Sequence, residues 1–527
     1  MHNRRLYPLL FVLAIFANMA YIRLTFIALW PHQHQTLAVP SSLRLGADLE
    51  HLRLRQIDDN RGRILYKSGL PWSGLSHLEK TSQAARHASL PAYVHSERDT
   101  QKNEPVIGEV GLPDKWPNEV RGAPEQGRSG LEYTFDPLLT SADVGYLGTF
   151  PRSHLVTPQQ ELFWHRGRKG ADIRTSIDAF WQTATEQALS RHRVAQGAIV
   201  VLDIRSRQVL AMASRTRGSS LVNEAVRAQV PGSVFKIVTA AAAFDSCRHS
   251  PRDTFFCSGQ LRRPGLTLNC WHRHGKENLF EAFAGSCDTA FAALGLETGK
   301  QGLGVAAQRL GVLGTGLQQV GGRPVLREAE TGRVFLGGTS TGDSGEAAHA
   351  AIGQQDVRLS PLQAANLAAT VADGGMYRDA QLVLDAQRDG RTLRRFSASA
   401  PRRALSPATA GYLKEAMYMA AHRSMGTATD IGRLPIPAAV KTGTAELGQS
   451  GGGSGIASGS GNGSGSGIGP QRVNSWMVGF APYEHPAIAF AVYVGNQEER
   501  RGHFQVHQIT RDLLQAYMQF QPDTVIG

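Results

Sequence analysis

The chain begins with an apolar stretch that is long enough to cross a membrane. Residues 6–22 are apolar apart from one asparagine, and after a single arginine a second apolar stretch covers 24–30. The first stretch has the minimum length of a spanning helix, and an arginine near its end can reach the interface. Basic residues precede it, which predicts a cytoplasmic N-terminus and an external remainder. A cleaved signal peptide is the alternative, but no convincing cleavage site follows. We therefore predict a single-pass anchor at 1–30.

The hydrophobic pattern changes twice after this anchor. Residues 31–170 contain short extended pieces, Pro-Gly turns and polar stretches, which predict a mostly β domain. From residue 171 to 527, apolar periodicities predict two hairpins with helices between them, and hence an antiparallel sheet flanked by helices. The predicted hairpins are 199–203 with 208–213 and 473–481 with 488–494, and the predicted helices are 233–245, 279–299, 360–373 and a closing helix with Ile509, Leu513 and Tyr517 on one face. A Gly/Ser-rich tract at 448–470 predicts a solvated, flexible insertion.

Composition supports a globular protein with an excess of positive charge. The 527 residues have room for two or three domains, and 41% of them are hydrophobic, enough for packed cores. The formal net charge is +12. The basic residues are scattered and are not interleaved with aromatic ones, so we predict no nucleic-acid partner. The charge instead favours anionic lipid headgroups and acidic polymers.

Three short motifs carry the candidate chemistry. They are Ser233-Val-Phe-Lys236, Ser286-Cys-Asp288 and Lys441-Thr-Gly443. A Pro-Gly pair precedes Ser233, which predicts that this serine lies in the first turn of a buried helix, where helix N–H groups favour an oxyanion. Lys236 is one turn later, within reach of the serine oxygen. Burial and the nearby charge of Lys441 would lower the pKa of Lys236 and make it a base.

The other two motifs supply a proton relay and an anion site. The hydroxyl of Ser286 can pass a proton from Lys236 to a leaving amine. Lys441 and the hydroxyls of Thr442 and Thr444 can hold a carboxylate. Gly443 would let a substrate backbone approach the strand edge closely. We expect the backbone N–H groups of Ser233 and Thr444 to form the oxyanion hole.

The three motifs resemble those of the class B, monofunctional penicillin-binding proteins. Further segments resemble the same family, both in the transpeptidase domain and in the membrane-proximal pedestal that precedes it. These segments are 60–64, 130–136, 175–178, 197–203, 353–363 and 474–482. The resemblance implies an α+β fold: a transpeptidase domain like that of serine β-lactamases at 171–527, and a mostly β pedestal at 31–170.

The same resemblance implies an activity and its partners. The family cross-links peptidoglycan stem peptides through a serine acyl-enzyme, and β-lactams acylate this serine because they mimic the D-alanyl-D-alanine end. Ser233 would be the nucleophile, and no cofactor is expected. The resemblance also implies a catalytic domain on the outer side of a bacterial cell membrane, working beside cell-wall synthesis partners such as a glycosyltransferase. The segment 31–170 is too short to hold a glycosyltransferase domain of its own.

One motif departs from the family pattern. The second motif usually ends in asparagine, whereas Asp288, when ionised, only accepts hydrogen bonds. It can pair with Lys236 or Lys441, or weaken binding of a substrate amide. Two functions therefore remain open beside an active transpeptidase: a D,D-carboxypeptidase, and a catalytically weak scaffold or β-lactam sensor. The intact Ser233, Lys236, Ser286 and Lys441 favour the enzyme.

The cysteines allow two interpretations. Cys257 and Cys270 frame a short segment, and an oxidising exterior would permit a disulfide between them. His272 and His274 lie close enough in sequence to suggest zinc, but this histidine pair departs from the usual spacing, so we predict no metal site. Cys287 is interpreted as a small buried packing residue.

Overall fold

The computed structural model describes most of the chain after the predicted anchor. Described are residues 53–58, 61–69, 72, 105–111, 126–140, 145–151, 160–165, 168–219, 222–246, 249–337, 344–447 and 472–520. Among these residues, no helix combines the length and the apolar character needed to cross a membrane. The predicted anchor at 1–30 and the predicted Gly/Ser insertion at 448–470 lie outside the described residues.

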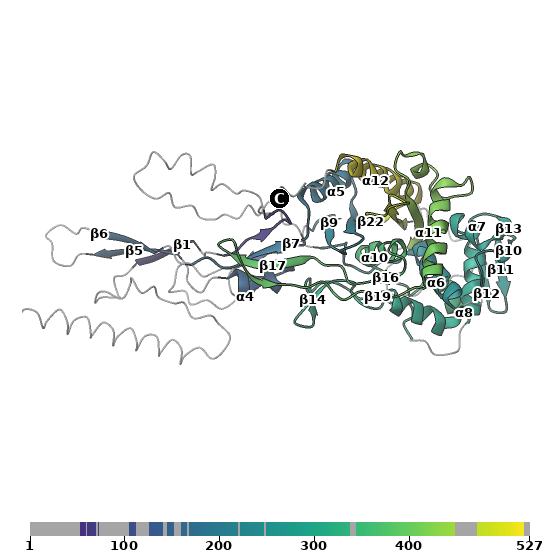
Figure 1. Ribbon diagram of the computed structural model, residues 1–527, viewed down its shortest axis with the longest axis horizontal. Helices are drawn as coiled ribbons and strands as arrows, with labels where there is room; N and C mark the ends of the chain where they lie inside the picture. The colour runs from purple at the N-terminus through teal and green to yellow at the C-terminus, as the bar shows by residue number, and fades with distance from the viewer. Residues whose placement is uncertain are drawn as a thin grey trace, which may run out of the picture. The chain divides into compact units, whose positions relative to one another are not determined.

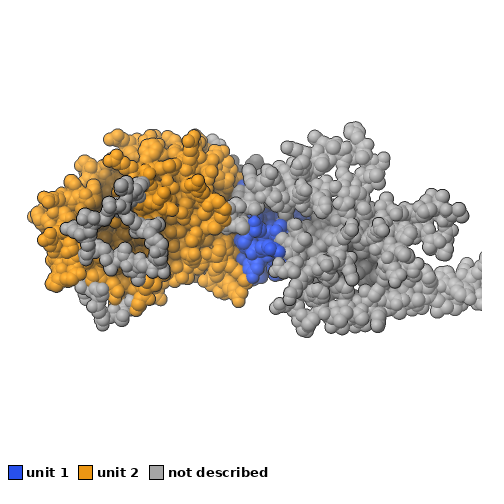
Figure 2. Space-filling model, turned by 180° about the vertical axis from the view of Figure 1, so that it is seen from behind, with its two compact units in different colours: residues 1–103, 107–175, 384–395 blue, residues 104–106, 176–383, 396–527 orange. Residues whose placement is uncertain are grey.

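The chain forms two compact units, coloured separately in Figure 2. The first takes residues 1–103, 107–175 and 384–395, and the second takes 104–106, 176–383 and 396–527. The sequence pattern placed the boundary at 170/171 and assigned 384–395 to the second domain. That segment is most of a hairpin whose first strand pairs with a strand of the first unit, a long-range contact that no local pattern reveals.

The described part of the first unit is mainly β, with two short helices. Its strands form sheets in the orders β18-β17-β7-β2, β1-β5-β6 and β3-β4. The elements are β1 (Arg53–Asp58), β2 (Ile64–Leu65), β3 (Val110–Gly111), β4 (Gln126–Gly127), α3 (Gly130–Thr134), α4 (Asp136–Leu139), β5 (Gly145–Pro151), β6 (Gln160–His165), β7 (Asp172–Thr175), β17 (Val383–Arg388) and β18 (Arg391–Arg395).

A buried arginine joins two of the family-like segments in this unit. The side chain of Arg61 is 1% exposed and forms ion pairs with Glu132 at 2.7 Å and Asp136 at 2.6 Å. The next residue must be a glycine, because a Cβ on Gly62 would lie only 1.8 Å from the carbonyl oxygen of Ala171. Arg61 of the first family-like segment therefore contacts Glu132 and Asp136 of the second.

The second unit is built on a five-stranded antiparallel sheet in the order β20-β21-β22-β8-β9. Figure 1 labels its strands β9 and β22. Its strands are β8 (Gln196–Asp203), β9 (Val209–Thr216), β20 (Ala439–Leu447), β21 (Arg472–Ala481) and β22 (Ile488–Glu498). Both predicted hairpins are present. The first and last strands of this sheet along the chain, β8 and β22, pair in its interior, so β20 and β9 are its edge strands.

Helices cover both faces of this sheet because its side chains alternate. Even-numbered residues of β22, such as Phe490 and Val492, share a core with α5 (Ala179–Arg191) and α12 (Glu499–Gln519). The opposite face carries Ala489 and Ala491, and their small side chains allow the buried helix α10 (Pro361–Ala372) to pack closely. The predicted face of the closing helix is confirmed, with Ile509 and Leu513 buried.

The remaining elements of the second unit lie outside the five-stranded sheet, and some of them carry residues of the candidate site. They are η4 (Gly232–Phe235), α6 (Lys236–Asp245), β10 (Thr254–Cys257), β11 (Gln260–Arg263), β12 (Leu266–Asn269), β13 (Gly275–Asn278), α7 (Leu279–Ala284), α8 (Asp288–Arg309), β14 (Gln319–Val320), β15 (Arg323–Pro324), α9 (Ser344–Ala351), β16 (Met376–Tyr377), β19 (Arg402–Arg403), α11 (Pro407–His422) and η5 (Ile431–Arg433).

Two predicted helices are each divided in the structure. The predicted helix 233–245 is a 3₁₀ turn, η4, followed by α6, so Ser233 lies in the 3₁₀ turn. The predicted helix 279–299 is interrupted at 285–287, between α7 and α8. Hydrophobic periodicity continues through both breaks, which is why the sequence did not reveal them. Lys236 of the first motif is the first residue after the first division, and Ser286 of the second motif lies within the second.

Candidate active site

Ser233 is positioned by a close contact between its own turn and strand β20. The preceding Gly232 has φ 54° and donates its N–H to the carbonyl of Gly353 at 3.0 Å. A Cβ on Gly232 would lie 2.1 Å from the carbonyl oxygen and 3.1 Å from the amide nitrogen of Thr444. The backbone next to half-buried Ser233 therefore runs beside that of Thr444, as the expected pair of oxyanion donors requires.

Gly443 is required by the protein's own packing. A Cβ there would lie 2.6 Å from the carbonyl oxygen of Pro231 and 2.8 Å from a methyl group of Val234. Our expectation was that a glycine would admit the substrate backbone. The structure gives a different reason: Gly443 admits the turn that carries Ser233.

Lys236 is completely buried at the start of α6, and three hydrogen bonds fix its amine. It donates to the carbonyl of Ser286 at 2.7 Å, to the hydroxyl of Ser286 at 3.2 Å and to Asp288 Oδ1 at 2.7 Å. The ring of Phe291 lies 5.5 Å from the same amine. Lys236 therefore joins the first motif to the second.

Ser286 connects the two buried lysines. It lies between α7 and α8 with φ 56°, the left-handed conformation that few residues other than glycine adopt. Its hydroxyl accepts hydrogen bonds from the amine of Lys236 and, at 2.9 Å, from that of Lys441. The predicted relay residue thus lies between a residue of the first motif and one of the third.

Lys441 projects from β20 on the face opposite to Val440 and is also fully buried. Besides Ser286, its amine donates to the carbonyl of Thr442 at 2.9 Å. Burial, and then the charge of Lys236, hold the pKa of Lys441 well below its usual value, while Asp288 acts in the opposite direction. The sequence analysis had treated Lys441 as a neighbouring charge and a carboxylate-binding group, and it did not predict this lowering.

Asp288 pairs with Lys236 rather than with Lys441. Its carboxylate is about one-fifth exposed and forms an ion pair with the buried amine of Lys236 at 2.7 Å. The sequence left both lysines open as partners. Asp288 is the first residue of α8, Lys236 is the first residue of α6, and these two helices pack against each other. This packing brings the carboxylate to Lys236.

The two threonines of the third motif contact residues that the sequence analysis did not select. The Thr442 hydroxyl lies 2.7 Å from that of Thr427, and the Thr444 hydroxyl lies 2.8 Å from Nε2 of His503 on α12. Burial and the neighbouring His507 lower the pKa of His503. No sequence signal marked His503 among the 18 histidines, because α12 reaches the site only through tertiary packing.

The disulfide that the sequence left open between Cys257 and Cys270 is not formed. Cys257 and Cys270 are free thiols, as is Cys287. The three sulfur atoms lie instead around the ring of His274, and His272 is exposed. Cys287 is buried, as expected, but it also belongs to this cluster.

The geometry joins all three motifs in one site, and comparison with known proteins agrees. Residues 197–515 match the family described as penicillin binding protein transpeptidase domain, which covers more than half of the chain. The chain belongs to the penicillin-binding protein transpeptidase family. The resemblance and the enzyme class predicted from the sequence are thereby confirmed.

Relatives of known function belong to the same family. Peptidoglycan D,D-transpeptidase PbpA of Mycobacterium tuberculosis is 27% identical over 462 residues, which cover 77% of this chain and 84% of the relative. The PbpA of Mycolicibacterium smegmatis is 28% identical, with 73% of this chain and 79% of the relative covered.

Solved structures of penicillin-binding proteins have the same fold. The ceftriaxone acyl-enzyme complex of penicillin-binding protein A from M. tuberculosis aligns with a TM-score of 0.52 at 26% identity, over 67% of this chain and 81% of that one. Pseudomonas aeruginosa PBP2 in complex with WCK 5153 aligns with a TM-score of 0.62 at 23% identity, over 88% and 97% of the two chains. At 23% identity, the comparison with PBP2 shows only that the two chains share a fold.

Proposed function

We propose that this protein is a peptidoglycan D,D-transpeptidase that forms an acyl-enzyme on Ser233. The observation that carries the proposal is the position of Ser286, whose hydroxyl accepts hydrogen bonds from both Lys236 and Lys441. This arrangement brings a proton acceptor, a relay and a cation to the turn of the nucleophile. Known relatives named peptidoglycan D,D-transpeptidase support the choice of reaction.

The first half-reaction would form the acyl-enzyme. Ser233 Oγ attacks the carbonyl carbon between the last two D-alanines of a stem peptide, and the serine proton passes to the amine of Lys236. The backbone N–H groups of Ser233 and Thr444 stabilise the oxyanion. The C–N bond then breaks, and Ser286 relays a proton to the departing amine. The terminal D-alanine leaves.

The second half-reaction would transfer the acyl group. The amine of a second stem peptide attacks the ester carbonyl carbon and loses its proton to the same relay. The bond from that carbon to Ser233 Oγ then breaks, the serine oxygen takes a proton back from Lys236, and the cross-linked peptide leaves. Attack by water would give D,D-carboxypeptidase activity instead. A β-lactam would stop the sequence at the acyl-enzyme, the state in which a related penicillin-binding protein was solved with ceftriaxone.

The substrate carboxylate would bind beside β20. Lys441, Thr442 and Thr444 are the polar side chains of the third motif, and Lys441 is buried beside them. Among the described residues, the amine of Lys441 donates to a hydroxyl and a carbonyl but to no carboxylate. A bound substrate carboxylate would supply that negative charge. Substrate binding would thereby favour the charged form of Lys441.

The proposal includes a location and further partners. The apolar stretch within residues 1–30 would hold the protein in the bacterial cell membrane as a single-pass anchor, with both units on the outer side. Stem peptides occur there, and a glycosyltransferase acting on the same polymer would be a working partner. Deleting residues 1–30 should move the protein from the membrane fraction to the soluble fraction, whereas membrane retention of the truncated chain would contradict the anchor.

One observation favours a second candidate, a catalytically weak penicillin-binding scaffold or sensor. The ion pair between Lys236 and Asp288 directs the proposed base toward a carboxylate. Such a scaffold would still be acylated by a β-lactam but would turn over stem peptides slowly. The two candidates differ in cross-linked product, so the assay must include an acceptor peptide.

The experiment is acylation followed by intact-mass measurement. The purified full chain in detergent, mixed with penicillin G, should gain the mass of one penicillin, and peptide mapping should locate it at Ser233. Ser233→Ala should abolish the adduct, whereas Ser190→Ala, at an exposed serine of α5, should retain it. An adduct on Ser233→Ala would refute the assignment. With lipid-linked stem peptides, cross-linked product supports the transpeptidase, and acylation without product supports the scaffold.

A further inference from the structure

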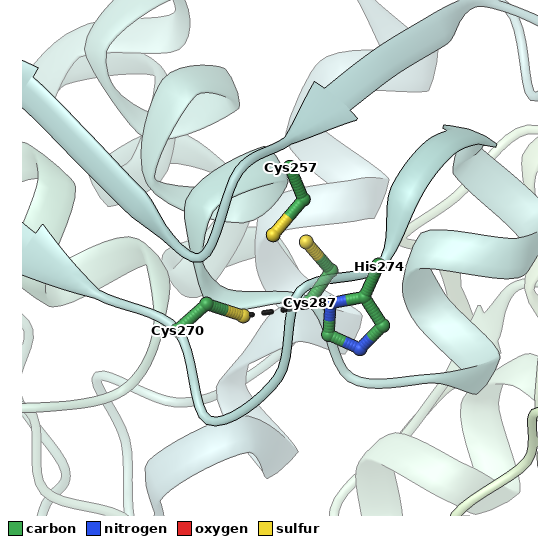
Figure 3. A group of neighbouring side chains, drawn as sticks. All are labelled: Cys257, Cys270, His274 and Cys287. Atoms are coloured by element: carbon green, nitrogen blue, oxygen red, sulfur yellow. Dashed lines mark hydrogen bonds between the residues drawn. The ribbon is translucent and has the colours of Figure 1, made fainter.

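Three cysteines and a histidine from three separate segments converge beside the second motif. Cys257 ends β10, Cys270 follows β12, His274 precedes β13, and Cys287 is the residue before α8. Their sulfur atoms and a ring nitrogen all lie within 4.8 Å of one another. Figure 3 shows the four side chains pointing toward a common centre. None of these contacts is used by the reaction proposed above.

The spacing of these atoms fits a tetrahedral metal ion. Zinc bonds to sulfur at about 2.3 Å and to imidazole nitrogen at about 2.0–2.1 Å, so a sulfur and a nitrogen on one ion are separated by about 3.6 Å. Cys270 Sγ and His274 Nδ1 are 3.6 Å apart. The upper limit of 4.8 Å leaves side-chain adjustments of about 1 Å to close the remaining edges.

The donor set indicates which metal would bind. Thiolates and imidazole are the ligands that zinc prefers, whereas magnesium and calcium take oxygen ligands. Cys257 is 1% exposed and Cys287 is fully buried, whereas Cys270 and His274 are half-buried, so the centre is shielded from water on one side. Four protein ligands fill a tetrahedral zinc site, which makes it a structural and not a catalytic centre.

The surroundings of His274 supply an independent observation. Its Nε2 is buried and has no hydrogen-bond partner among the described residues, and neither has Oε1 of Glu277. The negative charge of Glu277 acts on His274. A histidine that binds metal through Nδ1 carries its proton on Nε2, where a carboxylate is a common acceptor. Nδ1, the ring nitrogen that lies 3.6 Å from Cys270 Sγ, is therefore the one suited to bind the metal.

We propose that Cys257, Cys270, His274 and Cys287 bind one zinc ion that anchors the second motif. Cys287 lies between Ser286 and Asp288, and the N–H of Asp288 already donates to Cys270 Sγ at 3.3 Å. Zinc would tie the strands β10 and β12 to this segment and hold Ser286 in its left-handed conformation. Binding exchanges thiol protons for the metal and needs no oxidant.

Metal content tests the site directly. The full chain, purified in detergent under reducing conditions without chelator, should contain one zinc per chain by elemental mass spectrometry. Cobalt bound to the metal-free protein should show thiolate-to-cobalt charge-transfer absorption. Cys270→Ser and His274→Gln should lower zinc affinity by more than the roughly 10–100-fold that loss of an outer-shell partner costs.

Two neighbouring residues serve as matched controls. His272→Gln alters an exposed histidine two positions from His274, and Cys247→Ser alters the remaining cysteine; both should retain zinc. Wild-type protein that binds neither zinc nor cobalt would overturn the site without reference to any variant. Unchanged zinc affinity in Cys270→Ser and His274→Gln, or a Cys257–Cys270 disulfide in protein taken directly from its native membrane, would overturn it as well.

The effect on the active site rests on the proposed function and has its own readout. Removing zinc should slow acylation of Ser233 by penicillin roughly 10- to 100-fold, since a displacement of about 1 Å can cost this much, and zinc should restore the rate. An unchanged rate would overturn the anchoring role. If neither form is acylated, the proposed function fails, while the metal content still decides the zinc site.

Discussion

The amine of Lys236 and the carboxylate of Asp288 are 2.7 Å apart, one at the start of α6 and the other at the start of α8. The pair directs the proposed base toward the second motif. It also places a negative charge where the family pattern has a neutral amide, which makes Asp288 the most informative position for mutation.

Asp288→Asn should speed acylation by penicillin about tenfold, which corresponds to about 1.4 kcal/mol in the barrier. Asparagine retains an oxygen that accepts from Lys236 but removes the charge that draws the amine away from Ser233. Stopped-flow acylation rates of the two proteins at pH 7 measure the effect. Asp253→Asn, a change at a carboxylate that contacts His249 instead, serves as the control. A large loss of rate in Asp288→Asn would show that the carboxylate is needed to orient Lys236.

Lys441→Met should abolish substrate binding yet change stability in a pH-dependent way. Burial and the charge of Lys236 hold the pKa of Lys441 well below its ordinary value of 10.5. Between its folded-state pKa and 10.5, the unfolded chain binds more protons than the folded one, so wild-type stability rises with pH relative to the variant. Urea unfolding of both proteins from pH 6 to 9.5 measures this difference. A wild-type advantage that shrinks as pH rises would contradict the lowered pKa.

Gly443→Ala should destabilise the second unit by about 1–3 kcal/mol and slow acylation. The added methyl group would meet Pro231 and Val234 and displace the turn of Ser233. Gly411→Ala is the matched control, since a Cβ on this residue of α11 meets nothing within 4 Å. The control should gain roughly 0.5–1 kcal/mol from the lower entropy of its unfolded state. Thermal unfolding and penicillin acylation compare the two, and equal behaviour would rule out the steric explanation.

His503→Phe should raise the KM for a stem peptide with little change in kcat. The variant keeps an aromatic ring on α12 but loses the hydrogen bond that orients the Thr444 hydroxyl. His503→Gln retains a group that can bond to this hydroxyl and should restore most of the binding. Steady-state kinetics at pH 7.5 separate the two parameters. Equal KM values in both variants would show that the contact does not position Thr444.

The sheet and its hairpins were predictable because their signals are local. Short apolar runs in β8, β9, β21 and β22 are typical of strands buried on both faces, and such runs are legible from short windows. The helix starting near Ser233 was also predictable, but its division into η4 and α6 was not. The apolar run continues across both, and only the contact of Gly232 with Thr444 reveals the break.

By itself, the sequence determined the three motifs, their order and the family to which they point. These depend on residue types and spacings within one segment. The tertiary structure alone decided that Asp288 pairs with Lys236, that His503 reaches Thr444 and that Cys287 joins Cys257 and Cys270. Each of these contacts joins side chains from different elements, and no periodicity along the chain records which elements meet. The physical reason is that packing of whole helices and strands, rather than local spacing, sets those distances.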